Sequence, residues 1–67
     1  MGDLRETLMR IQMEYVEMPD LKLTMWQARR LWNLEAEVCE AALGTLVRAK
    51  FLWQTHDGAY LRTASAQ

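Results

Sequence analysis

Residues 23–40, LTMWQARRLWNLEAEVCE, predict two helices joined by a turn of only a few residues. Thr24 stands where a helix N-cap is expected, and Gln27 follows three residues later, which is the spacing of a capping box. Asn33 can adopt the left-handed conformation that ends many helices. A turn this short holds the two helices beside each other, so the rest of the chain must fold around this pair.

A further helix is predicted before this pair. Residues 3–17 have apolar side chains at helical spacing, and Pro19 ends the helix because proline cannot continue its hydrogen bonds. Its inner face is predicted to consist of Leu4, Leu8, Ile11, Tyr15 and Met18. In the helix that starts at Met25, the predicted inward residues are Met25, Ala28 and Leu31, with Trp32 joining the core.

The C-terminal half predicts a long helix followed by a hairpin. Residues 35–49 form the helix, with Cys39, Ala42, Leu43 and Leu46 as its inner stripe. Residues 51–55 and 59–62 are predicted strands on either side of Asp57-Gly58, a strong hairpin signal, and residues 21–23 form a short strand. A two-residue turn would place Trp53 opposite Arg62 and allow a cation–π contact. Lys50 stands where glycine is common, so we expect left-handed strain there.

Length and charge bound the possible functions. With 67 residues the chain forms at most one domain, which we place at residues 1–62 with a flexible tail at 63–67. A net charge of −1 argues against strong sequence-independent binding to nucleic acid. The single cysteine excludes an intramolecular disulfide. No signal peptide and no apolar run of about 18 residues is present, so we expect a cytoplasmic protein without a membrane partner.

The order helix, short strand, helix, helix, hairpin resembles the winged helix-turn-helix superfamily, and in particular short stand-alone winged-helix proteins of bacteria. Three patterns carry the resemblance: L-T-x-x-Q-A-x-R-L-W-x-L, C-x-x-A-L-x-x-L-V-x-A-x-F-L and D-G-x-Y-x-R. It covers residues 4–62 and implies a small, mainly helical α+β fold. In DNA-binding members the third helix lies in the major groove, while the second helix and the wing hold phosphates.

The first hypothesis from this resemblance is a transcriptional regulator that binds double-stranded DNA. Arg48, with Glu37 or Glu40, would lie near bases, since glutamate can accept a hydrogen bond from cytosine N4. Ala41 and Gly44 would form a strip of small residues that allows close approach. The expected phosphate contacts are Arg29, Arg30, Lys50 and Arg62.

The alternative hypothesis is a protein-interaction module with the same fold. Met9, Met13 and Val16 form a second apolar stripe on the first helix, centred about 140° from the core stripe. One small domain does not cover both stripes, so this helix is expected to bind a protein partner or a second copy of the chain. Trp26 is a further candidate contact. The acids of the third helix and a wing without Lys or Arg at residues 54–59 favour this alternative.

We expect no enzymatic activity, metal or cofactor. The single histidine, His56, lies at the predicted hairpin tip, and Cys39 lies on an apolar stripe, so the two cannot assemble a catalytic pair or a structural zinc site. The three glycines are isolated and form no phosphate-binding loop.

Overall fold

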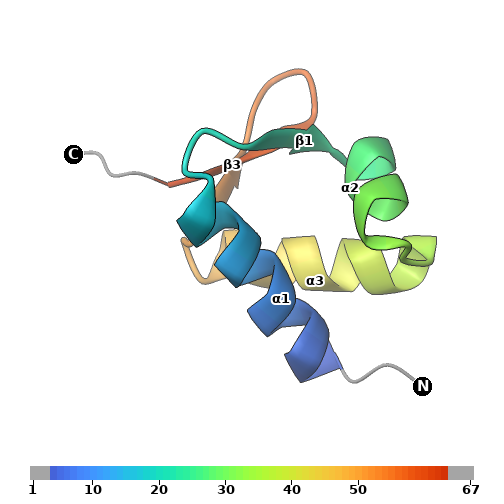
Figure 1. Ribbon diagram of the computed structural model, residues 1–67. Helices are drawn as coiled ribbons and strands as arrows, with labels where there is room; N and C mark the ends of the chain where they lie inside the picture. Colours follow the sequence, from blue (N-terminus) through green and yellow to red (C-terminus); the bar gives the residue numbers. More distant parts are fainter. Residues whose placement is uncertain (1–3, 64–67) are drawn as a thin grey trace.

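The computed structural model describes residues 4–63, which form three helices and one three-stranded antiparallel sheet (Figure 1). The fold is therefore a small, mainly helical α+β arrangement, and each element lies within one residue of its predicted bounds. In chain order the elements are α1 (Leu4–Glu17), β1 (Lys22–Thr24), α2 (Met25–Trp32), α3 (Ala36–Arg48), β2 (Leu52–Gln54) and β3 (Ala59–Arg62).

Both ends of α2 are capped as the sequence predicts. The Gln27 backbone N–H donates to the Thr24 hydroxyl at 3.2 Å, and the Thr24 backbone N–H donates to Gln27 Oε1 at 3.0 Å. Asn33 has a φ of 54°, in the left-handed region, and the backbone N–H groups of Asn33 and Leu34 both donate to the Arg29 carbonyl. These caps limit α2 to eight residues and turn the chain into α3.

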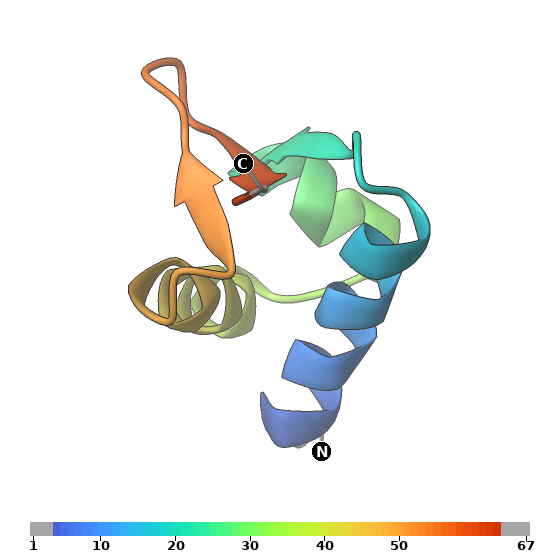
Figure 2. The same cartoon turned by 90° about the vertical axis from the view of Figure 1, so that its left-hand side faces the viewer.

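The sheet has the strand order β1-β3-β2, so the return strand of the hairpin is the central strand. Tyr60 of β3 lies between Leu23 of β1 and Gln54 of β2. Figure 2 shows the hairpin loop projecting beyond the helices, with α3 viewed nearly along its axis. The short strand β1, which precedes α2, is thus held in the sheet by its pairing with β3.

The hairpin loop is one residue longer than predicted. The Thr55 N–H donates to the Ala59 carbonyl at 2.8 Å, and the Gly58 N–H donates to the Thr55 carbonyl at 3.0 Å. Three residues therefore form the loop, and Gly58, with a φ of 89°, takes the left-handed position such a loop requires. The register shifts by one residue, so Trp53 lies opposite Leu61. The predicted pairing of Trp53 with Arg62 is wrong.

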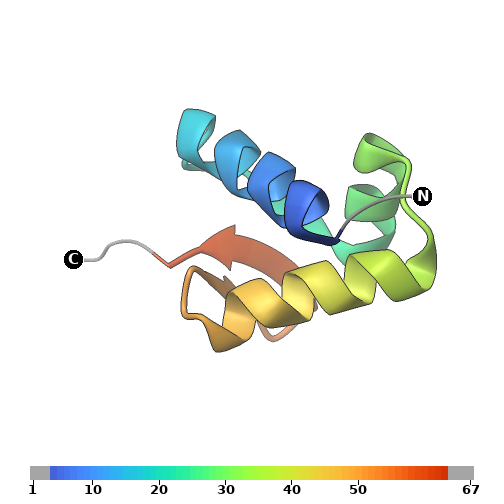
Figure 3. The ribbon, with the colours of Figure 1, turned by 90° about the horizontal axis from the view of Figure 1, so that it is seen from below.

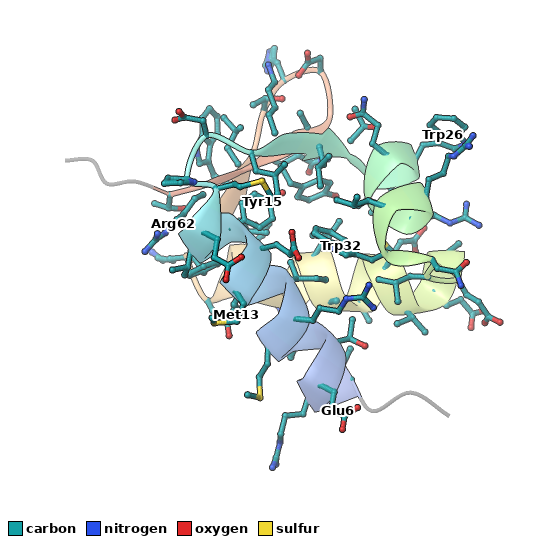
Figure 4. The ribbon with its side chains drawn as sticks, viewed as in Figure 1. Glu6, Met13, Tyr15, Trp26, Trp32 and Arg62 are labelled. Carbon is teal, nitrogen blue, oxygen red and sulfur yellow. The ribbon has the colours of Figure 1, made fainter. Side chains whose placement is uncertain are left out.

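The core forms where the three helices meet the sheet. The Tyr15 hydroxyl donates to the Tyr60 carbonyl at 2.9 Å, and the rings of Tyr15 and Trp32 lie 6.4 Å apart at a tilt of 51°. Both side chains point toward the centre of the molecule (Figure 4). The buried cluster consists of Ile11, Tyr15, Ala28, Trp32, Cys39, Ala42, Leu43, Leu46, Leu52 and Tyr60.

Three residues predicted to be in the core are exposed instead. Leu4 and Met18 lie at the start of α1 and just past its end, where no neighbouring element covers them. In α2, Ala28 and Trp32 are buried as predicted, with Trp32 only 2% exposed, but Leu31 is 51% exposed. The face of so short a helix is decided by its largest side chain, because burying the indole removes more apolar surface from water.

The end of α3 carries the strain that the sequence predicts. Lys50 has a φ of 66°. Its N–H donates to the Val47 carbonyl at 3.0 Å, and the Phe51 N–H donates to the Leu46 carbonyl at 2.9 Å. These two bonds are those of a Schellman motif, in which glycine is the favoured residue at the position that Lys50 occupies.

The described residues extend one residue past the predicted domain boundary. Thr63, predicted to begin the flexible tail, donates its backbone N–H to the Phe51 carbonyl at 2.9 Å. Residues 1–3 and 64–67, including the rest of the predicted tail, lie outside the described residues. Within residues 4–63, no helix has both the length and the apolar character needed to span a membrane.

Replacing Tyr15 with Phe removes the buried hydroxyl and keeps the ring. We expect the free energy of unfolding at pH 7 to fall by about 1 kcal/mol, the net value of one intramolecular hydrogen bond. Urea denaturation measures this change. A variant as stable as the parent would contradict the role given to this bond.

The same variant tests the alkaline limit of the fold. Burial, with smaller contributions from Cys39 and Tyr60, raises the pKa of Tyr15 from 10.0 to about 12. Because the folded state favours the neutral phenol, its stabilisation is complete below pH 10.0 and is lost as the pH rises through about 12. Urea denaturation across this range should show a smaller loss for Tyr15→Phe than for the parent. Equal losses would show that other groups control alkaline unfolding.

Lys50→Gly tests the strain at the end of α3. Glycine adopts a positive φ without a Cβ clash, so we expect the free energy of unfolding to rise by about 1 kcal/mol. The matched control is Ala49→Gly, at the C-cap position with a φ of −79°. It should lower stability, because glycine there relieves no strain and adds entropy to the unfolded chain. Equal effects of the two substitutions would contradict this account.

Candidate nucleic-acid interface

The outer face of α3 carries the residues that the sequence predicts to face DNA. Its inner stripe is buried in the core, while Glu37, Glu40, Ala41 and Arg48 are exposed and Gly44 is half-buried. The charges on this face are divided along the helix. Both acids lie in the first half, and Arg48 is the last residue. The face is therefore acidic where α3 begins and basic where it ends.

The strip of small residues on this face is partly covered by Arg48. Arg48 Nη2 donates to the Thr45 hydroxyl at a long 3.5 Å, and a Cβ added at Gly44 would lie 3.7 Å from Arg48 Nη1. The Thr45 hydroxyl in turn donates to the Ala41 carbonyl at 2.7 Å. The guanidinium thus lies back along its own helix, and it must swing outward before it can contact a ligand in front of α3.

Two of the predicted phosphate contacts are stacked on aromatic rings. The Arg30 guanidinium lies 4.8 Å from the ring centre of Trp26, which is 61% exposed, and the Arg62 guanidinium lies 5.2 Å from the ring centre of Phe51. Within the described residues, neither guanidinium takes part in an ion pair. Stacking holds a guanidinium in place and leaves the N–H donors in its plane free to bind an anion.

The basic residues lie toward the two ends of α3. Arg62 of β3 is paired with Leu52 of β2, which follows Lys50 by two residues. Arg48, Lys50 and Arg62 therefore lie near one another where α3 ends. Figure 3 shows α2, which carries Arg30, beside the beginning of α3. In Figure 4, Trp26 and Arg62 stand on opposite sides of the molecule. With 13 residues, α3 separates the two basic groups by about 20 Å.

Arg29 differs from the other predicted contacts because part of its guanidinium is buried. Its Nε atom is buried without a hydrogen-bond partner among the described residues, as is Nε1 of Trp32. Burial raises the pKa of the Cys39 thiol, and the positive charge of Arg29 opposes this shift, so Arg29 lies close to α3. Its guanidinium is therefore less available to phosphate. Cys39, fully buried and with a raised pKa, is protonated at neutral pH and is not an activated nucleophile.

The tip of the hairpin is anionic. His56 and Asp57 are both exposed there. The Thr55 hydroxyl donates to the Asp57 carboxylate, and this hydrogen bond, with a weaker contribution from Lys22, lowers the pKa of Asp57. Residues 54–59 include no lysine or arginine, so phosphate contacts from this hairpin are restricted to Arg62 at its base.

The outer face of α1 forms a second candidate surface, made of apolar residues. Met9, Met13 and Val16 are 57%, 54% and 47% exposed, as the sequence predicts, and Met13 points away from the molecule (Figure 4). With Leu4 and Met18, α1 and the residue after it supply five of the nine exposed large apolar residues in the described part of the chain. An apolar surface concentrated on one helix favours a protein contact.

Comparisons with protein-family models, with curated proteins and with solved structures found no match. Within residues 4–63, no cluster of three or more His, Cys, Asp or Glu side chains is placed to hold a metal ion. The candidate surfaces therefore rest on the residues of this chain alone.

Sequence reasoning missed the contact of Arg30 with Trp26 and assigned Arg62 to the wrong ring, Trp53 instead of Phe51. Trp26 and Arg30 are four residues apart on one helix, a spacing that brings side chains together, so the sequence contains a signal for this contact. The contact of Arg62 with Phe51 depends on the hairpin register, which a two-residue turn would have changed. No local pattern indicates it.

Gly44→Ala tests whether the glycine on the outer face of α3 lowers the stability of the fold. The added methyl would meet Arg48 at ordinary contact distance, so helix propensity should dominate and raise the free energy of unfolding by up to about 1 kcal/mol. The control Ala41→Gly, on the same face, should lower it by a similar amount. Thermal or urea unfolding gives both values. A destabilised Gly44→Ala would mean that this glycine is required by the fold itself.

Proposed function

We propose that the protein is a small winged-helix protein that binds double-stranded DNA and acts as a transcriptional regulator. In this proposal α3 enters the major groove, and Arg30, Lys50 and Arg62 contact phosphates on either side of it. The observed order of elements agrees with the superfamily that the sequence resembles. One observation carries the proposal: Arg30 and Arg62 are stacked on aromatic rings, without ion pairs among the described residues, toward opposite ends of an exposed helix.

This placement of charge suits a polyanion better than a solvated surface. A stacked guanidinium has lost part of its rotational freedom before binding, and its free N–H groups match the oxygens of a phosphate. Basic groups about 20 Å apart, toward the two ends of α3, would contact different phosphates along one groove. Arg48, which lies over Gly44 in the free protein, would turn toward base edges, where arginine binds guanine through two hydrogen bonds.

The acids of α3 lower the expected affinity for nonspecific DNA. Glu37 and Glu40 are exposed and repel phosphates, so the electrostatic gain from Arg30, Arg48, Lys50 and Arg62 is partly cancelled. A glutamate at a base edge accepts a hydrogen bond from the N4 amino group of cytosine, and it is repelled by a base that presents a hydrogen-bond acceptor at that position. In this proposal the protein therefore binds mixed-sequence DNA weakly, and its affinity depends strongly on the base sequence of the site.

A second function, a protein-interaction module without DNA binding, is favoured by α1. Five exposed apolar residues on and just past this helix bear no relation to phosphate contacts. The two functions differ in their response to salt. Apolar contacts weaken little between 50 and 200 mM salt. Phosphate contacts weaken strongly, and the affinity falls by about 10⁵-fold for proteins that make the most phosphate contacts.

Fluorescence anisotropy of labelled duplex DNA tests the proposal. Three phosphate contacts, from Arg30, Lys50 and Arg62, predict a salt slope of about −2.7, which is a loss of affinity of about fortyfold between 50 and 200 mM salt. Arg62→Ala should reduce the slope by about one. The matched control Lys22→Ala, which removes the same charge from β1, should leave it unchanged. No binding at low salt, or equal effects of these two substitutions, would contradict DNA binding and favour the second function.

A further inference from the structure

We propose that α1 is a homodimer interface, in which two copies of the chain pair through antiparallel α1 helices centred on Met13. This inference does not depend on DNA binding. It assigns the exposed apolar stripe of α1 to one occupant, a second copy of the same helix, and it specifies the orientation of the pair.

The outer face of α1 is accessible over most of the helix. Ile11 and Tyr15 are fully buried on the side that faces the core, while Met9, Met13 and Val16 are all about half exposed on the far side. Figure 2 shows α1 along the outside of the molecule, with the sheet and α3 on its other side. Nothing in the described part of the chain covers this stripe, so a second molecule can approach it directly.

The charges beside the stripe are complementary to a second copy. At 100° per residue, Glu6, Arg10 and Glu17 all fall on the same flank of the stripe. In an antiparallel pair the same flanks of the two helices meet. Pairing centred on Met13 sets residue 10 of one copy level with residue 16 of the other, about 1.5 Å along the axis from residue 17. Arg10 of each copy therefore lies beside Glu17 of the other, and the pair of charges occurs twice.

A parallel pair fits these residues less well. It would bring the flank with Arg10 and Glu17 against the opposite flank, which carries Arg5 and Gln12, so Glu17 would have no basic partner. Parallel helices also align their dipoles unfavourably, whereas antiparallel helices oppose them. Within the described residues Arg10 and Glu17 form no ion pair of their own, so both are available to the second copy.

The contact is limited in size. A 14-residue helix is about 21 Å long and about 10 Å wide with its side chains, so one helix pair buries less than the roughly 1,200 Å² at the lower end of stable interfaces. The dimer should therefore dissociate as the protein is diluted. The experiment must cover concentrations on both sides of this transition.

Sedimentation equilibrium of the full chain without DNA tests the proposal. Over about a hundredfold range of concentration, the average mass should rise from that of the monomer toward that of the dimer. Met13→Glu should keep the chain monomeric, and Arg10→Glu should weaken association. The double variant Arg10→Glu, Glu17→Arg should restore it, because the exchanged charges still pair. Lys22→Glu changes the charge equally on another element and should have no effect.

Circular dichroism of each variant verifies that the chain still folds, as expected for substitutions at exposed positions. A monomer at every concentration would overturn the proposal. So would a dimer that is insensitive to Met13→Glu, because it must then use another surface. Because no DNA is present, failure here is independent of failure of the proposed function.

Disulfide crosslinking tests the orientation. In the antiparallel pair, residue 9 of one copy lies near residue 16 of the other, while the two residues 9 lie about 12 Å apart along the axis, too far for a disulfide. A mixture of the Met9→Cys and Val16→Cys variants should crosslink on mild oxidation, and Met9→Cys alone should not. Crosslinking of Met9→Cys with itself would contradict the antiparallel arrangement. Cys39 is fully buried and does not compete.

Discussion

The hydrogen bond from the Tyr15 hydroxyl to the Tyr60 carbonyl connects α1 to the central strand of the sheet. Tyr60 is in the central strand, paired with β1 on one side and β2 on the other, so this one bond connects α1 to the whole sheet. The Tyr15 ring also contacts Trp32, which fixes the inner face of α2. In a chain of this size the core is thin, so Tyr15 and the fully buried Ile11 fix the side of α1 that faces the core. With Tyr15 turned inward, Met13 necessarily faces outward.

Features of the fold that depend on neighbouring residues could be predicted from the sequence. The capping box at Thr24, the left-handed Asn33 and the strained Lys50 all arise from interactions within three to five residues. Features that depend on contacts between elements could not. Trp32 is in the core as predicted, but Leu31 is exposed because α2 turns its indole toward Tyr15, which lies far away in the sequence. The hairpin loop is a local feature that sequence reasoning nevertheless missed: the Thr55 hydroxyl accepts from the Ala59 N–H and donates to Asp57, an arrangement that stabilises the longer loop.

The candidate surfaces follow the same division. The exposed stripe of α1 and the outer face of α3 could be predicted because helical periodicity places their residues. The contact of Arg30 with Trp26 had a local signal, a spacing of four residues on one helix, whereas the position of the Arg62 guanidinium depends on the fold of the hairpin. The structure also brings Arg29 toward Cys39 and lays Arg48 along its own helix. Of the basic residues predicted near α3, Arg30, Lys50 and Arg62 then remain available to bind an anion. Since α1 and α3 present their outer faces on different sides of the molecule, DNA binding and dimer formation would not compete (Figure 3).

The most direct test of this account is a ¹⁵N NMR titration of the protein with duplex DNA at low salt, because it locates the contact as well as detecting it. We predict shifts in the backbone amides of the outer face of α3 and in the side-chain Nε–H signals of Arg30 and Arg62, while the amides of Met9, Met13 and Val16 keep their positions. Shifts confined to α1, or a spectrum that DNA leaves unchanged at low salt, would contradict the assignment of α3 as a DNA-binding surface.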